Sequence, residues 1–145
     1  MTKDERKAVI AFLKSFRDMK RETALMGLRL DVLREKLLSP TLALITFNGE
    51  DISSRQVHED ALALENELLL NAKRLSDTYR KIERMVDLLE SGEIKTAFYT
   101  RYVCGDTWVK VQHKVGCSER HARRFAYKGL EQFSELFKSK QADVL

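Results

Sequence analysis

Residues 102–133 have the sequence YVCGDTWVKVQHKVGCSERHARRFAYKGLEQF, and this stretch decides the fold of the C-terminal part of the chain. Gly116 can adopt the left-handed backbone conformation that ends a helix, and Ser118 can accept a hydrogen bond from the first N–H groups of the next helix. Asp106 or Thr107 is a candidate N-cap for the first of these helices. We therefore predict two helices joined by a tight turn between Gly116 and Ser118.

The spacing of apolar residues predicts which side of each helix is buried. The inward residues of the first helix are Trp108, Val111 and Val115, and those of the second are Ala122, Ala126, Leu130, Phe133 and Phe137. Because alanines are small, Ala122 and Ala126 allow the two helices to approach closely.

The outward side of the second predicted helix is basic. Between Thr107 and Lys128 there are six Lys or Arg residues and one acid, a local charge of +5, whereas the whole molecule carries +4. Such a patch can bind phosphates, and Arg can make paired hydrogen bonds to guanine in the major groove. A solvated helix face has the same residue types, so charge alone leaves that alternative open. Together with the turn, the pattern favours a helix-turn-helix that binds double-stranded DNA.

The same segment carries a family resemblance. Residues 101–108 (RYVCGDTW), Val111, residues 115–118 (VGCS) and residues 123–130 resemble the helix-turn-helix of sigma-factor region 4. The full chain resembles the small phage-encoded regulators of the ArpU and RinA type, in which a long helical part precedes such a motif. The resemblance implies a transcription regulator of phage or prophage late genes. One position departs from the family pattern, since Gln112 stands where a small Ala is usual.

Residue by residue, the resemblance implies DNA-facing positions early in the second helix and a phosphate contact one turn later. The candidate DNA-contacting residues are Thr107, Lys110, Ser118, Glu119, Arg120, His121, Arg123, Arg124, Tyr127 and Lys128. A zinc site is the alternative use of Cys104, His113, Cys117 and His121, which form the pattern C-x8-H-x3-C-x3-H. This spacing is not that of a standard zinc site, so we expect no metal or other cofactor.

The N-terminal two thirds follows a heptad pattern. One apolar seam runs through Val9, Phe12, Phe16, Met19, Met26, Leu30, Leu33 and Leu37, and a second through Val57, Ala61, Leu64, Leu68, Leu75, Ile82, Met85 and Leu89. Polar residues interrupt the seams at Thr23, Asn71 and Thr78. We predict an all-α protein in which residues 1–91 form a coiled-coil hairpin of two long helices and residues 92–145 form the helix-turn-helix domain.

The predicted hairpin has a loop at about residues 39–56, which contains Pro40 and the turn-forming pair Asn48-Gly49. A two-helix hairpin leaves the apolar residues beside its seams only partly covered. These flanking residues are Leu13, Leu28, Leu38, Leu62, Leu69 and Val86. We therefore expect a homo-oligomer that assembles through the N-terminal helices. A buried Asn71 would fix the helix register, and a partly exposed one would not.

The remaining features exclude several classes of protein. The chain lacks a signal peptide and any apolar run long enough to span a membrane, so we expect a cytoplasmic protein with reduced cysteines. It has no phosphate-binding glycine loop and no recognisable catalytic pairing, so we do not expect an enzyme. Two alternatives to a transcription regulator stay open: a small-terminase-like DNA-packaging protein, and an adaptor that docks on RNA polymerase.

Overall fold

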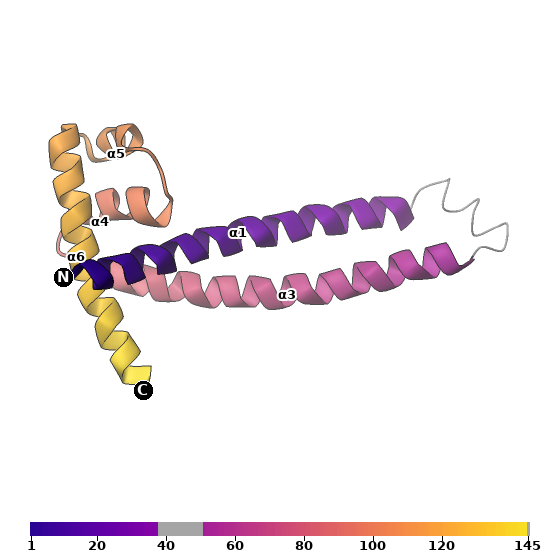
Figure 1. Cartoon of the computed structure of the whole chain (residues 1–145). Helices are drawn as coiled ribbons and strands as arrows, with labels where there is room; N and C mark the ends of the chain where they lie inside the picture. Colours follow the sequence, from indigo (N-terminus) through magenta and orange to yellow (C-terminus); the bar gives the residue numbers. More distant parts are fainter. Residues whose placement is uncertain (38–50, 145) are drawn as a thin grey trace. The chain divides into compact units, whose positions relative to one another are not determined.

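The structure is a computed structural model that describes residues 1–37 and 51–144, with side chains described for residues 1–37 and 55–140. The helices are α1 (Lys3–Leu37), α3 (Asp51–Asp87), α4 (Gly92–Phe98), α5 (Trp108–Val115) and α6 (Glu119–Val144), with a π-helical turn η1 (Tyr99–Val103) after α4 (Figure 1). The described residues include no β-strand. The prediction of an all-α fold that begins with two long, packed helices is confirmed.

The two long helices have 35 and 37 residues. α3 begins at Asp51, so the predicted loop is wrong over residues 51–56, which are helical. The physical reason is that no Gly or Pro follows Gly49 before the heptad pattern begins at Val57, and a helix therefore starts earlier than its apolar seam. The rest of the predicted loop, including Pro40, lies outside the described residues.

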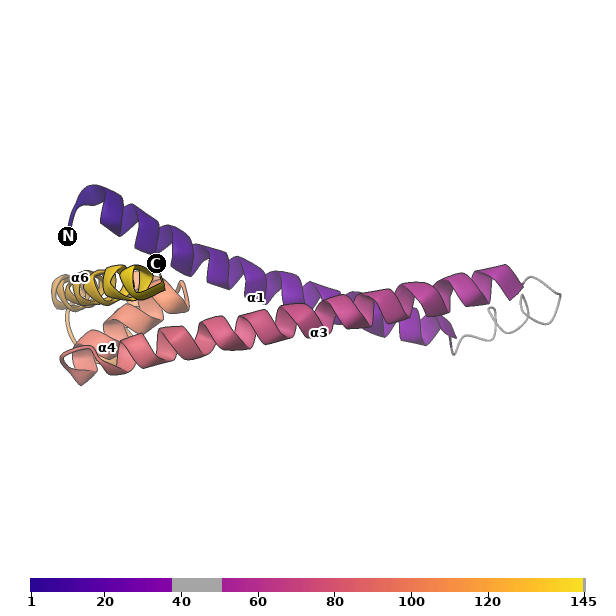
Figure 2. The ribbon, with the colours of Figure 1, turned by 90° about the horizontal axis from the view of Figure 1, so that it is seen from below.

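One compact unit consists of Met19–Ser76, in which the second half of α1 and most of α3 lie side by side (Figures 1 and 2). Its buried apolar residues include Met26, Leu30 and Ala61. Thr23, a polar interruption of the seam, donates its hydroxyl to the Met19 carbonyl at 2.8 Å. Asn71 is only partly buried and donates to Sδ of Met26 at 3.1 Å, so the seam tolerates this amide without enclosing it.

The other compact unit joins Met1–Asp18 with Asp77–Leu145. The chain therefore divides differently from the predicted division into residues 1–91 and 92–145. Figure 2 shows α6 between the first turns of α1 and the last turns of α3. Phe12 of α1 lies against Phe137 of α6, with ring centroids 5.0 Å apart.

This arrangement corrects the prediction for two of the flanking residues. Leu13 and Val86 are buried, with exposed fractions of 1% and 6%, because each belongs to a part of α1 or α3 that joins the C-terminal helices in one compact unit. Leu28, Leu62 and Leu69 are exposed, as predicted. Leu38 lies outside the described residues.

The centre of this unit is aromatic and closely packed. Phe98 of α4 is fully buried, and its ring centroid lies 4.9 Å from that of Phe133 and 5.6 Å from that of Tyr102. α4 approaches α6 closely at Gly129, since a Cβ at this position would meet the Phe98 Cβ at 2.6 Å. Ser91 caps α4 by accepting a hydrogen bond from the Ile94 N–H.

Candidate nucleic-acid interface

The turn between α5 and α6 has the geometry predicted from its residues. Thr107 caps α5 by accepting from the Lys110 N–H at 3.4 Å. Gly116 has φ +74° and ψ +40°, the left-handed conformation, and its N–H donates to the Gln112 carbonyl at 2.8 Å. Ser118 accepts from the His121 N–H at 3.3 Å and therefore opens α6. One helix ends and the next begins within three residues.

The predicted inward side of α6 is buried. Ala122 and Ala126 have no exposed surface and form one cluster with Ala97 and Val111. Trp108 and Val115 of α5 are partly buried against this cluster. The small underside of α6 is thus fixed against α4 and α5, and its opposite side is exposed.

Arg120 and Arg124 lie one helical turn apart on this exposed side. Together with His121 they line a concave site of about 280 Å³. Within the part of the chain that the structure describes, neither guanidinium has a hydrogen-bond or ion-pair partner. Both are therefore available to a ligand of opposite charge.

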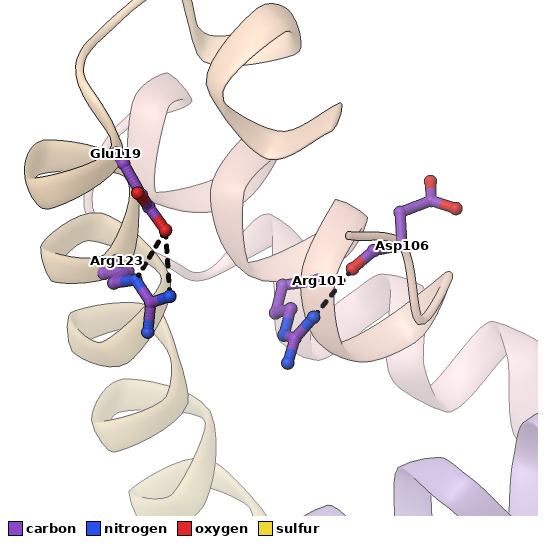
Figure 3. A network of polar contacts seen from close by, with 4 residues as sticks. All are labelled: Arg101, Asp106, Glu119 and Arg123. Carbon is purple, nitrogen blue, oxygen red and sulfur yellow. Dashed lines mark hydrogen bonds and ion pairs between the residues drawn. The ribbon is translucent and has the colours of Figure 1, made fainter. Parts of the chain in front are cut away.

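Arg123, in contrast, is bound within the protein. Its Nη2 and Nε donate to Oε1 of Glu119 at 2.9 and 3.3 Å (Figure 3). Its guanidinium carbon also lies 4.8 Å from the centre of the Trp108 ring. The prediction placed both Glu119 and Arg123 among the DNA-contacting residues, and the structure pairs the two with each other.

Trp108 has a second cation beside it. The Arg101 guanidinium lies 4.4 Å from the same ring centre, and Arg101 also donates to the Asp106 carbonyl at 3.0 Å (Figure 3). Such cation–π contacts stabilise by about 0.5–1 kcal/mol at exposed sites. Because Trp108 begins α5 and Arg123 belongs to α6, these contacts fix the two helices relative to each other.

The remaining candidate residues also have partners. Lys110 lies 3.7 Å from the Asp106 carboxylate, and Lys128 lies 3.4 Å from that of Glu90. The Ser118 hydroxyl contacts Nδ1 of His121 at 2.8 Å. Both ion pairs are at the surface, where such pairs are weak and readily exchanged for a phosphate partner.

Tyr127 is bound by a residue that the sequence did not indicate. Its hydroxyl accepts a hydrogen bond from Nη1 of Arg6 at 3.2 Å, and the Arg6 guanidinium carbon lies 5.6 Å from its ring centre. Arg17, also from α1, donates to the Tyr102 carbonyl. Burial raises the pKa of the Tyr102 hydroxyl, so this group is neutral at physiological pH. No pattern in the sequence around Arg6 or Arg17 predicts these contacts.

A larger groove of about 550 Å³ runs beside these contacts. It is lined by Tyr102, Trp108, Arg123, Arg124, Tyr127, Lys128 and Glu131. Three of these residues are cations and one is an acid, so the groove is positively charged. Arg124 lines both this groove and the smaller concave site beside Arg120. The basic surface therefore continues along α6 from Arg120 to Lys128.

The four residues of the alternative zinc pattern do not converge. Neither Cys104 nor Cys117 forms a disulfide. Among the described residues, no three His, Cys, Asp or Glu side chains gather closely enough to hold a metal ion. Within residues 1–37 and 51–144, no helix combines the length and apolarity needed to cross a bilayer.

Comparison with known proteins finds no matching family model, no matching curated protein and no matching solved structure. The resemblance to sigma-factor region 4 and to the ArpU and RinA type thus stays a prediction from the sequence. The geometry of α5, its turn and α6 is the basis for the function considered next.

Proposed function

We propose that the chain binds double-stranded DNA with α6 and acts as a transcription regulator. The observation that carries the proposal is the pair Arg120 and Arg124, which are exposed, one turn apart and without partners among the described residues. Unpaired guanidinium groups bind phosphates and can make two hydrogen bonds to guanine. A solvated helix surface can also carry two arginines one turn apart, and duplex binding distinguishes the two alternatives.

The packing of α6 supports the same proposal. A recognition helix enters the major groove with its N-terminal residues, while a second helix holds it in position. Ala122 and Ala126 are fully buried, and the Ser118 cap fixes the first turn, so Arg120 and Arg124 project from a rigid support. Rigid support reduces the entropy lost when these side chains bind a ligand.

A salt titration of duplex binding tests the proposal. The affinity for a short duplex of mixed sequence should fall steeply as salt rises. The double substitution Arg120→Ala/Arg124→Ala should weaken binding by at least about tenfold, whereas the matched change Arg29→Ala/Arg74→Ala, on exposed arginines of the long helices, should not. Absence of binding at low salt, or equal losses in the two variants, would refute the assignment of α6 to DNA and favour an adaptor.

We further propose that two or more chains associate through the unit Met19–Ser76, so that several α6 helices bind one DNA. Leu28, Leu62 and Leu69 have exposed fractions of 63%, 61% and 62%, and Leu62 and Leu69 lie seven residues apart on α3. Large apolar residues exposed in this way are typical of a surface that contacts another protein chain. Association raises the effective concentration of the second DNA-binding helix at a paired half-site.

Sedimentation equilibrium tests the association. Leu62→Glu/Leu69→Glu should reduce the molecular mass to that of a monomer, and Leu88→Glu, which changes an equally exposed leucine outside this unit, should not. A ring of many subunits would favour DNA packaging. A dimer whose footprints lie at promoters would favour transcription, and the resemblance to phage regulators suggests late-gene promoters as the first to examine.

A further inference from the structure

The start of α1 contacts α6 at two positions, Tyr127 and Lys138. Arg6 contacts Tyr127 through its hydrogen bond and its position over the ring. Three turns further along α6, Lys138 donates to Oε1 of Glu5 at 3.0 Å. These contacts fix the first turns of α1 beside the proposed DNA-binding helix, although the two segments lie at opposite ends of the sequence.

The first turn of α1 is itself well ordered by local hydrogen bonds. Thr2 and Glu5 form a reciprocal capping box, in which the Thr2 N–H donates to Oε2 of Glu5 and the Glu5 N–H donates to Oγ1 of Thr2, both at 3.1 Å. One oxygen of the Glu5 carboxylate therefore binds the cap, and the other binds Lys138. Lys138 and the cap hold the pKa of Glu5 below its ordinary value, so its charge is neutralised by partners within the protein.

Lys3 and Lys7, the lysines of this part of α1, are not paired with another described residue as Glu5 is. Lys3 is three residues before Arg6 and four before Lys7, and residues at these spacings share one side of a helix. Lys3 and Lys7 are exposed, and the described part of the chain provides neither with a hydrogen-bond or ion-pair partner. A free cationic edge of α1 therefore adjoins the contact between Arg6 and Tyr127.

We propose that Lys3 and Lys7 bind the phosphate backbone of the same duplex that α6 contacts, as a second, sequence-independent part of the interface. Arg6 acts as a positioning residue, because it is held by Tyr127 and fixes the edge that carries the two lysines. The inference rests on the proposed function of α6, and it adds a DNA contact from a second segment, at the other end of the sequence.

The salt dependence of binding gives a quantitative test. Each phosphate contact contributes about 0.9 to the slope of log affinity against log salt, so Lys3→Gln/Lys7→Gln should reduce the slope by about one to two. The preference for a footprinted site over a duplex of mixed sequence should not change, because phosphate contacts carry no sequence information. The matched control is Lys20→Gln/Lys36→Gln, which removes the same charge from exposed positions elsewhere on α1.

The outcomes separate this inference from the proposed function. A shallower slope for Lys3→Gln/Lys7→Gln alone supports the inference. If both double variants bind like the unchanged protein, or lose slope equally, the inference is overturned while DNA binding by α6 stands. If the unchanged protein does not bind duplex at low salt, the proposed function fails and the inference fails with it. Both substitutions are on exposed side chains, so circular dichroism should show full helicity in each.

Discussion

The Arg6 guanidinium donates a hydrogen bond to the Tyr127 hydroxyl at 3.2 Å across 121 residues of sequence, and it also lies over the Tyr127 ring. The contact joins the first helix of the chain to its last. Because both side chains are at the surface, solvent weakens their interaction, and its main consequence is to fix the direction in which the start of α1 points.

A double-mutant cycle should measure this coupling. We expect Arg6→Ala and Tyr127→Phe each to lower the free energy of unfolding, since the first removes both contacts and the second removes only the hydrogen-bond acceptor. Because Phe keeps the ring, the coupling energy reports the hydrogen bond alone, and it should be about 0.5–1 kcal/mol by urea denaturation. A coupling indistinguishable from zero would show that this hydrogen bond does not stabilise the protein in solution.

Gly129 should be required by packing. Gly129→Ala should destabilise the protein by on the order of 1–3 kcal/mol, because the added methyl group would meet the Phe98 Cβ at 2.6 Å. The energetic cost of this clash exceeds any gain in helix propensity. Gly27→Ala is the control, since nothing lies within 4 Å of its added Cβ, and it should stabilise by about 0.5–1 kcal/mol. Thermal unfolding should therefore shift in opposite directions, and a shift in the same direction would contradict the close approach of α4 to α6.

Gly116 and Gly129 show which features the sequence can predict and which it cannot. The caps at Thr107 and Ser118 and the left-handed Gly116 were predictable, because each depends on neighbours within four residues. Gly129 gave no signal, since its cause is Phe98, a residue from another helix.

The packing of α1 with the C-terminal helices could not be predicted from the sequence for a related reason. Val9 and Phe16 continue the heptad seam, and the same spacing results whether a helix packs on one partner or on several. The informative residue is Leu13, which lies outside the seam and yet is only 1% exposed. Its burial requires a wider covered face than a two-helix pair provides, and Leu13 belongs to the compact unit that includes the C-terminal helices.

The pH dependence of stability should report the Glu5 contact. The pKa of Glu5 is lowered in the folded protein by Lys138 and by the cap, so the folded state binds its proton less readily than the unfolded state does. The resulting stability is present above the unfolded pKa of about 4.3 and is lost as the pH falls through the lower folded pKa. Glu5→Gln should reduce the loss of stability on acidification below about pH 4.3, as measured by urea unfolding at a series of pH values. If Glu5→Gln leaves the loss of stability at acid pH unchanged, Glu5 is not paired with Lys138 in solution. Glu59→Gln is the control, because it changes a different exposed carboxylate.

Arg123 and Arg124 should behave differently although they are adjacent. Arg124 is free to contact a base, so Arg124→Ala should reduce discrimination between a footprinted site and a mixed-sequence duplex by about 1–3 kcal/mol. Arg123 is held by Glu119 and Trp108, so Arg123→Ala should weaken both complexes to a similar extent by loosening α6 against α5. Competition binding with both duplexes measures the difference. If Arg123→Ala instead abolished discrimination while affinity for mixed sequence was kept, Arg123 would have to leave Glu119 and contact a base in the complex.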